Sequence, residues 1–197
     1  MKHILFVTSY GPSLINFRLS LIKKLLFKGY KVSVASPKEN FSNTLQKELK
    51  KLGVHVNIFS LSRTGLNIFQ DCNCLFQIYK IIQNSKPNII ISYTSKPVIY
   101  TGLVLKFFKE IEYYPLITGL GYYFIPRGSI KYKIIKYLII KLYSKGIKNS
   151  KKIIFQNKDD QSLFLKLGII INKKITKIVI GSGVDLNTFP KSTLPSK

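Results

Sequence analysis

The segment at residues 8–13 combines hydroxyl side chains with a Gly11–Pro12 pair, directly before a helical pattern. Glycine lets the backbone approach a ligand closely, and the N–H groups at a helix N-terminus attract phosphate. The segment has neither the Gly-x-Gly-x-x-Gly pattern of dinucleotide-binding folds nor the Walker pattern of ATP-binding loops. It therefore indicates either a phosphate-facing loop or a plain strand-to-helix turn. Arg18, in the first or second turn of that helix, either reaches an anion or lies in solvent.

Two more basic residues follow candidate strands. Arg63 is one of three arginines in a chain that otherwise uses lysine. Because a planar guanidinium matches phosphate and carboxylate better than an ammonium group does, we favour a binding role for Arg63. Lys96 follows Thr94 and Ser95. Either these three side chains bind a sugar or a phosphate, or one of the hydroxyls only caps the next helix.

Residues 118–128 form the most unusual segment, because glycines, three aromatic side chains and an arginine occur there in no regular period. Aromatic faces pack against sugar rings and lipid chains, and an arginine would bind an attached phosphate. The alternative is a loop of ordinary core aromatics. The candidate binding residues of this segment are Gly119, Gly121, Tyr122 and Arg127.

Catalytic side chains are not evident in these segments. They contain no histidine, which disfavours a Ser–His or Cys–His nucleophile. The neighbouring carboxylates Asp159 and Asp160 are typical of a helix N-terminus. Cys72 and Cys74 are too close for a good disulfide and too few for a metal site, so we expect reduced, structural thiols. The catalytic residues stay unidentified, and no metal site is expected.

Short β-rich runs alternate with longer helical runs along the chain. Strands are expected at residues 4–9, 31–36, 55–61, 88–93, 114–118, 152–156 and 177–180, and helices at 16–28, 42–52, 66–84, 97–109, 130–145 and 159–167. This alternation predicts an α/β fold with a Rossmann-like, open and mostly parallel sheet of about seven strands, covered by helices on both faces. Because ligands bind beyond the carboxyl ends of such strands, the segments above should converge on one edge of the sheet.

Basic residues dominate the charge of the chain. There are 32 Lys and Arg residues against 8 Asp and Glu residues, a formal net charge of +24. Such a surface attracts anionic lipid, phosphate or nucleic acid, although an AT-rich genome would also inflate the lysine content. Basic residues concentrate between Arg127 and Lys152, around a helical run that an anionic bilayer would attract. No recognised nucleic-acid motif is present, so nucleic acid is not the expected partner.

The chain shows no pattern of a membrane-spanning segment. Its N-terminus indicates a strand rather than a signal peptide, and no run reaches about 18 uncharged apolar residues. We expect a cytoplasmic protein that is peripherally associated with the inner face of the plasma membrane.

Four motifs together resemble the N-terminal domain of family 4 glycosyltransferases, which have the GT-B fold. They lie at residues 16–18, at 59–63 with Asn67, at 118–121, and at 181–185 with Phe189. The last of them resembles the hinge that leads into the family's second domain. Within the family, the chain looks most like bacterial transferases that extend polyprenyl-diphosphate-linked acceptors, including N-acetylgalactosaminyltransferases of N-glycan assembly.

The resemblance implies transfer of a sugar from a nucleotide donor with retention of configuration, and without a metal or another cofactor. The resemblance implies that Gly11 and Pro12 face the donor diphosphate. The residues expected to bind the acceptor or its phosphate are Arg18, Arg63, Lys96, Gly119, Gly121, Tyr122 and Arg127. Many relatives have a histidine where this chain has residues 118–120, so the role of that histidine is not carried over.

The expected organisation is one acceptor-side domain at residues 1–185, followed by a linker or tail at 186–197. In the family, a second domain binds most of the donor nucleotide and supplies paired glutamates. We therefore expect the N-terminal half of a truncated or split enzyme, inactive without a separate or missing donor-binding domain. The competing interpretation is a basic module that binds membrane or nucleic acid and has no catalytic activity.

Overall fold

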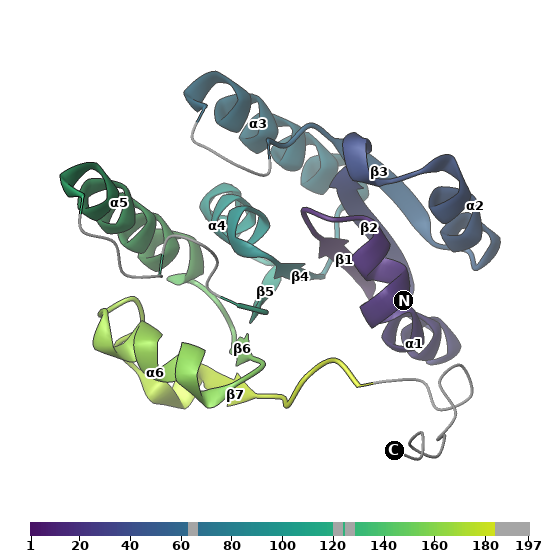
Figure 1. The fold of residues 1–197 in the computed structure, drawn as a ribbon. Helices are drawn as coiled ribbons and strands as arrows, with labels where there is room; N and C mark the ends of the chain where they lie inside the picture. The colour runs from purple at the N-terminus through teal and green to yellow at the C-terminus, as the bar shows by residue number, and fades with distance from the viewer. Residues whose placement is uncertain (63–66, 120–123, 125–128, 184–197) are drawn as a thin grey trace, which may run out of the picture.

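Parallel pairing joins seven strands into one sheet with the order β3-β2-β1-β4-β5-β6-β7 (Figure 1). The computed structural model describes residues 1–62, 67–119, 124 and 129–183, and the structural statements below concern these residues. The strands are β1 (His3–Val7), β2 (Lys31–Pro37), β3 (His55–Phe59), β4 (Ile89–Tyr93), β5 (Glu112–Ile117), β6 (Ile153–Phe155) and β7 (Thr176–Ile178). The helices are α1 (Pro12–Phe27), α2 (Asn43–Lys51), α3 (Ile68–Ser85), α4 (Ser95–Val104), α5 (Ile130–Ile147) and α6 (Lys158–Lys166).

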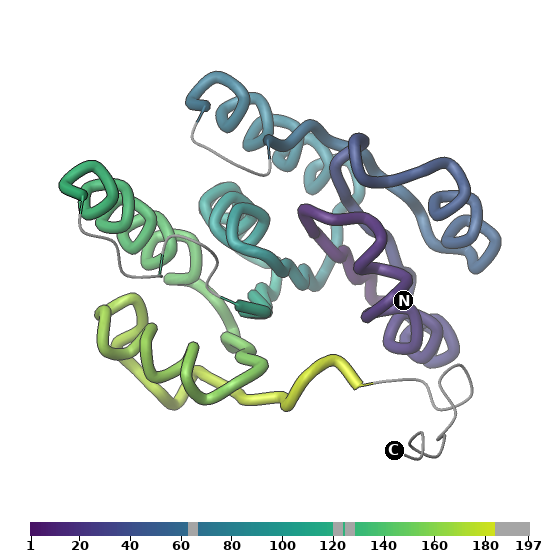
Figure 2. The backbone as a smooth tube through the Cα atoms, in the orientation of Figure 1, coloured from purple at the N-terminus to yellow at the C-terminus, as the bar shows by residue number. Residues whose placement is uncertain are grey.

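The sheet separates two hydrophobic cores, because successive side chains of a strand point to opposite faces. Along β1, Ile4 and Phe6 belong to the core beneath α1 and α2, whereas Leu5 and Val7 belong to the core beneath α3, α4, α5 and α6. The backbone tube in Figure 2 shows these helices on either side of the sheet. The continuous apolar run of β1 is therefore buried on both faces, as expected for a parallel sheet.

The strand order reverses between β1 and β4. The chain first builds the sheet from β1 through β2 to β3, and α3 then carries it back so that β4 pairs with the other side of β1. In the register, Ile4 lies opposite Ile89, and Val7 lies opposite Ser92. The carboxyl ends of β1 and β4 are consequently neighbours at a topological switch point, the place where open parallel sheets bind ligands.

The predicted fold class is confirmed: the sheet is parallel, and seven strands alternate with six helices. The differences lie at element ends. The first helix begins at Pro12 rather than at residue 16, because proline is favourable in the first turn of a helix, where its missing N–H is not needed. The predicted helix at 97–109 is α4, which begins at Ser95 and ends at Val104, followed by a single 3-10 turn at Leu105–Phe107.

Helices α4 and α5 approach each other through two glycines. A Cβ atom added at Gly102 would lie 1.6 Å from the carbonyl oxygen of Gly146, and one added at Gly146 would lie 2.9 Å from the carbonyl oxygen of Ile99. The absence of side chains at both positions therefore allows the close backbone contact. This contact holds α5 against the helix that begins at the switch point.

Both cysteines are free thiols, as expected from their spacing. Burial raises the pKa of Cys74 to about 12, because the interior disfavours the thiolate, while Cys72 is exposed. Within the described part of the chain, no helix is both long enough and apolar enough to cross a bilayer.

Candidate functional site

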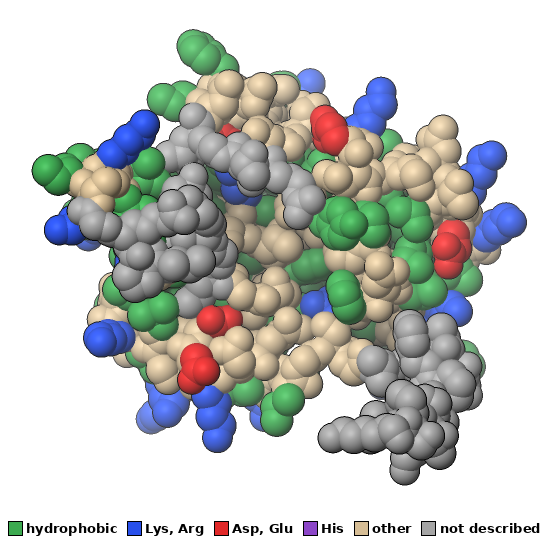
Figure 3. Space-filling view, viewed as in Figure 1, with side chains coloured by type: hydrophobic (Ala, Val, Ile, Leu, Met, Phe, Trp, Pro, Cys, Tyr) green, Lys and Arg blue, Asp and Glu red, His purple; other side chains and the backbone are tan. Residues whose placement is uncertain are grey.

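Hydroxyl groups join the two strands at the switch point. The backbone N–H of Ser9, after β1, donates to Thr94 Oγ1, after β4, at 3.2 Å. The Thr94 hydroxyl in turn donates to Ser9 Oγ at 2.8 Å. The surface is hollowed near the middle of the view in Figure 3, with basic side chains visible around it. We call the carboxyl ends of β1 and β4, with the starts of α1 and α4, the switch-point rim.

Most amide donors of the Gly11 loop are engaged within the protein. The N–H groups of Ser9 and Tyr10 donate to Thr94 Oγ1 and Thr8 Oγ1, and the next helix residues bond to the carbonyls of Tyr10 and Gly11. Pro12 has no N–H to offer. A phosphate at this loop would therefore meet few free backbone donors, so the loop contributes mainly its position at the rim.

Position 11 requires glycine because the loop packs closely against Asn40 and Phe41. A Cβ atom at this position would lie 2.6 Å from a ring atom of Phe41 and 2.7 Å from the carbonyl oxygen of Asn40. Its backbone is helical, with φ −55 and ψ −45, so no left-handed conformation demands glycine here. The orientation of Gly11 and Pro12 toward a donor diphosphate stays a prediction.

A buried hydroxyl network continues behind the loop. The Ser13 hydroxyl lies 3.0 Å from the hydroxyl of Tyr93 and 3.4 Å from that of Thr8. Tyr93 is almost fully buried, and this burial raises the pKa of its phenol. These side chains are neutral hydrogen-bonding groups, of the kind that recognises sugar hydroxyls or supports a neighbouring cation.

Arg18 is the neighbouring cation, and it is buried, with a relative exposure of 6%. Its guanidinium carbon lies 5.0 Å from the centre of the Tyr93 ring, and its Nη1 donates to the Phe17 carbonyl and to Ser182 Oγ at 2.9 and 2.8 Å. Among the described residues, its Nε has no hydrogen-bond partner and its guanidinium forms no ion pair with a carboxylate. Burial lowers the pKa of Arg18, because desolvation disfavours the charged form. The solvent-exposed alternative for Arg18 is therefore excluded.

The backbone is strained at Thr94, which precedes α4. Its φ of 69 and ψ of 151 lie in a region that is almost restricted to glycine. A β-branched residue adopts this conformation only when its surroundings enforce it, and here its hydroxyl is held by Ser9. Thr94 does not cap α4 with its side chain, so its hydroxyl joins the two strand ends instead.

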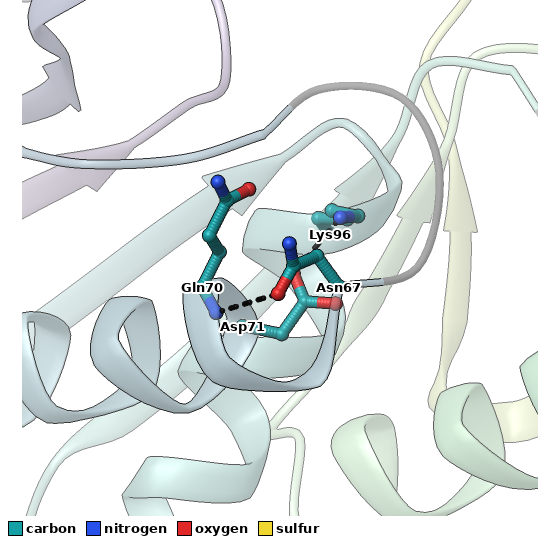
Figure 4. Close-up of polar contacts among 4 residues, drawn as sticks. All are labelled: Asn67, Gln70, Asp71 and Lys96. Carbon is teal, nitrogen blue, oxygen red and sulfur yellow. Dashed lines mark hydrogen bonds and ion pairs between the residues drawn. The ribbon is translucent and has the colours of Figure 1, made fainter.

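Lys96 is on the opposite side of the rim and is paired with an acid. Its Nζ lies 2.9 Å from Asp71 Oδ1 in the first turn of α3, and both side chains are 15% exposed. Figure 4 shows Lys96 reaching from α4 toward this turn, where Asn67 Oδ1 accepts a hydrogen bond from the backbone N–H of Gln70 at 3.2 Å. Burial is the main cause that raises the pKa of the nearby Tyr100, and a hydrogen bond with Asp71 is the second cause. The Lys96 charge is thus largely compensated inside the protein.

The other candidates are only partly described. Gly119 lies two residues after the end of β5, is exposed and has a φ of 144, in the region that favours glycine. Arg63, Gly121, Tyr122 and Arg127 lie outside the described residues. Phe124, from the aromatic segment, is buried against Tyr143 and Phe164, with ring centroids 6.2 and 6.4 Å away. Phe124 is therefore a core aromatic side chain, which is the alternative given above for this segment.

Sequence reasoning missed three contacts of the rim. Tyr93 supports Arg18, Ser182 accepts its hydrogen bond, and Asp71 neutralises Lys96. A weak signal existed for two of them. Ser182 stands between two glycines, and Asp71 is one of only 8 acidic residues in the chain.

An open groove lies away from the rim, at the far end of the sheet. This groove has a volume of about 550 Å³, lies between α6 and β7, and is lined by Lys158, Lys173 and Lys177 among others. Three surface lysines without a buried, unpartnered polar group do not define a binding site, so the rim remains the candidate site.

Comparisons with known proteins agree with the fold. Residues 3–157 match the model of the family described as "Glycosyl transferase 4-like". A curated relative from Campylobacter jejuni, "N,N'-diacetylbacillosaminyl-diphospho-undecaprenol alpha-1,3-N-acetylgalactosaminyltransferase", is 27% identical over 184 residues. The match covers 93% of this chain and 47% of that protein, so the chain spans about half the length of this relative.

Solved structures show the same fold at low sequence identity. A glycosyltransferase from Rickettsia africae is similar over 96% of this chain and 45% of its own, with 16% identity and a TM-score of 0.59. A putative UDP-N-acetylglucosamine 2-epimerase from Listeria monocytogenes is similar over 100% of this chain and 50% of its own, with 13% identity and a TM-score of 0.61. Because the family model covers most of the chain, the predicted family is confirmed: this chain belongs to the glycosyl transferase 4-like family and has the N-terminal-domain fold of a GT-B glycosyltransferase.

Proposed function

We propose that this chain is the acceptor-binding half of a retaining nucleotide-sugar glycosyltransferase that acts on a polyprenyl-diphosphate-linked acceptor. Membership of the family supports sugar transfer. The name of the Campylobacter jejuni relative supports the acceptor class, because that protein acts on a sugar carried by diphospho-undecaprenol.

The position of Arg18 is the observation that carries the proposal. It is a buried cation at the topological switch point, with no described carboxylate beside it and with an unpartnered Nε. A buried charge without a counter-ion is costly, and a diphosphate would supply the missing anion through charge-assisted hydrogen bonds. The surrounding hydroxyls of Ser9, Ser13 and Thr94 suit the sugar next to it.

The remaining binding residues take secondary roles in this proposal. Gly119 follows a neighbouring strand, β5, at the same edge of the sheet, and Lys96 binds an anion only when Asp71 releases it. We further propose contacts of Arg63, Gly121, Tyr122 and Arg127 with the acceptor. Gly11 and Pro12 would face the diphosphate of a donor held by the second domain.

Turnover, in this proposal, requires a donor-binding domain, supplied by the same or by a separate polypeptide. The match to about half of the curated relative supports this view. The test combines the purified chain with labelled nucleotide sugars and an undecaprenyl-diphosphate-linked sugar in detergent. We expect saturable binding of the lipid-linked sugar without transfer, and transfer after a donor-binding domain of the family is added.

Two results would contradict this proposal in different ways. Transfer by the chain alone would refute the requirement for a second domain. Absence of saturable acceptor binding would refute the acceptor role. Lys24→Ala, which removes an exposed cation from the same helix as Arg18, provides the matched control for Arg18→Ala in the binding assay.

We also propose that α5 rests on an anionic membrane while the acceptor is bound. One face of α5 is buried through Tyr132, Ile139 and Tyr143. Another face exposes apolar side chains at helical spacing, together with exposed lysines. The exposed apolar residues are Ile130, Ile134, Tyr137 and Leu138, and the exposed lysines are Lys131, Lys133, Lys141 and Lys145. Apolar insertion and lysine–lipid attraction are the two contributions that bind interfacial helices.

Vesicle sedimentation tests the membrane proposal. We expect binding to phosphatidylglycerol-containing vesicles, weak binding to pure phosphatidylcholine vesicles, and a loss of at least about tenfold in Ile134→Glu/Leu138→Glu. Lys47→Ala/Lys50→Ala on α2 changes the net charge equally but, at the other end of the sheet, should change binding little. Equal losses in both double variants, with steeply salt-dependent binding of DNA, would instead favour the basic-module interpretation.

A further inference from the structure

The chain segment after β7 is hydrogen-bonded to α1, the helix that follows the central strand β1. β7 is the last strand of the sheet, four places from β1, yet the hydroxyl of Ser182 accepts a hydrogen bond from Arg18 on α1 at 2.8 Å. It also accepts one from Nε2 of Gln156, at the end of β6, at 2.9 Å. Figure 1 shows this segment leaving β7 and running toward α1.

Two glycines shape the segment around Ser182. Gly181 has a φ of 65 and Gly183 a φ of 72, in the left-handed region that favours glycine. At the base of the segment, the N–H of Val179 donates to the carbonyl of Phe155 at 2.8 Å. The backbone therefore turns at Gly181 and at Gly183, and Ser182 is the only residue between the two turns.

Arg18 is well suited to hold this hydroxyl. Its guanidinium is buried against the Tyr93 ring, and a second bond to the Phe17 carbonyl fixes its direction. Because the guanidinium is planar and rigid, the donor aimed at Ser182 is preorganised. Arg18 is buried and Ser182 is exposed, so the buried side of this contact lies on α1 and the exposed side lies on the segment after β7.

We propose that Arg18, Ser182 and Gln156 form a clasp that sets the direction in which the chain leaves the sheet, across the carboxyl edge toward α1. Arg18 is a positioning residue in this device. The clasp requires no sugar transfer and no acceptor, so it is independent of the proposed function. Its consequence is that the described part of the segment, which ends at Gly183, runs back toward α1 rather than away from the β7 edge.

Nuclear magnetic resonance of the full chain tests the clasp. The chain has only three arginines, so the Arg18 side-chain N–H signals are readily assigned. We expect Ser182→Ala to speed the exchange of the Arg18 guanidinium protons and of the Val179 amide with water by about fivefold or more. Ser182→Thr keeps the hydroxyl and should restore slow exchange.

A double-mutant comparison distinguishes a clasp from separate structural effects. Arg18→Ala and Ser182→Ala should each speed Val179 exchange, and the combined variant should exchange no faster than either one. Lys24→Ala should leave the exchange rate unchanged. Unchanged Arg18 and Val179 exchange in Ser182→Ala, or additive effects of the two changes, would overturn the proposal. The Ser182 variants alter only an exposed side chain, so they decide the question even if Arg18→Ala does not fold.

Discussion

Arg18 and Lys96 are two cations on opposite sides of β4, and the protein treats them differently. Arg18 lies on the α1 side, buried against Tyr93, with hydroxyl and carbonyl partners and without a described carboxylate. Lys96 lies on the α3 side, partly exposed, with Asp71 at 2.9 Å. No described carboxylate therefore compensates the charge of Arg18, whereas Asp71 compensates the charge of Lys96. Proximity to a strand end does not by itself make a cation a binding group.

The largest expected effect concerns the packing on the two sides of β4. Gly102→Ala, on the Lys96 side, should destabilise the fold by about 3 kcal/mol or more, because the new Cβ meets the backbone of Gly146. Gly11→Ala, on the Arg18 side, should cost less, about 1–2 kcal/mol, because its Cβ would overlap the Asn40 carbonyl oxygen and the Phe41 ring less severely, at 2.7 and 2.6 Å. Chemical denaturation measures both. Equal costs would show that the Gly11 loop is as tightly held as the helix contact.

The next effect compares the two cations directly. Arg18→Ala should weaken binding of inorganic pyrophosphate or of the lipid-linked acceptor by at least about tenfold, because a charge-assisted hydrogen bond is lost. Lys96→Ala should weaken it by only about two- to threefold, the range expected for a compensated, partly exposed charge. Isothermal titration calorimetry checks both values, with Lys24→Ala as the control. A larger loss for Lys96→Ala would reverse the comparison.

A smaller effect should follow from releasing Lys96. Asp71→Asn removes the carboxylate that compensates it and should strengthen pyrophosphate binding by about threefold, while costing roughly 1 kcal/mol of stability or less. The gain should disappear at high salt, because the freed ammonium is partly exposed. Asp71→Asn combined with Lys96→Ala provides the control and should show no gain. A gain that persists in the double variant would mean that Asp71 acts on another group.

The smallest expected effect is a pH dependence of stability that arises at the amino end of the sheet and not at the switch-point rim. His3 is buried there, with its ring nitrogens 2.9 Å from the Ser85 carbonyl and 2.8 Å from Ser33 Oγ, and burial lowers its pKa below the ordinary 6.5. Below pH 6.5 the unfolded chain takes up a proton that the folded chain resists, so stability should fall as the pH drops from 6.5 toward the lower pKa of the folded state.

His3→Gln should remove that loss of stability, measured by denaturation at several pH values, with His55→Gln on the edge strand β3 as the matched control. Arg18 keeps its charge throughout this range. Persistence of the slope in His3→Gln would place its origin elsewhere in the chain.

The sequence predicted the elements well because their signals are local. Apolar runs such as residues 4–7 and 89–91 indicated strands buried on both faces, and Gly29 and Gly53, which follow helices, have the positive φ values of helix ends. Placing candidate residues in the segments after strands also brought Gly11, Lys96 and Gly119 to one edge, because all strands of a parallel sheet end there.

Partners that are distant in the chain could not be predicted in this way. Ser182 is 164 positions from Arg18, and Asp71 is 25 positions from Lys96. No periodicity couples such positions. Likewise, the packing of Phe41 against Gly11 depends on how the segment after β2 folds back over the first loop.

The amino-acid sequence alone determined the kind of architecture and the edge on which binding groups gather, because strand and helix patterns and strand-end positions are local properties. Only the tertiary structure decided which cation is compensated and which is not. The reason is the crossover of α3, which places β4 beside β1 and so brings Tyr93 against Arg18 and Asp71 against Lys96.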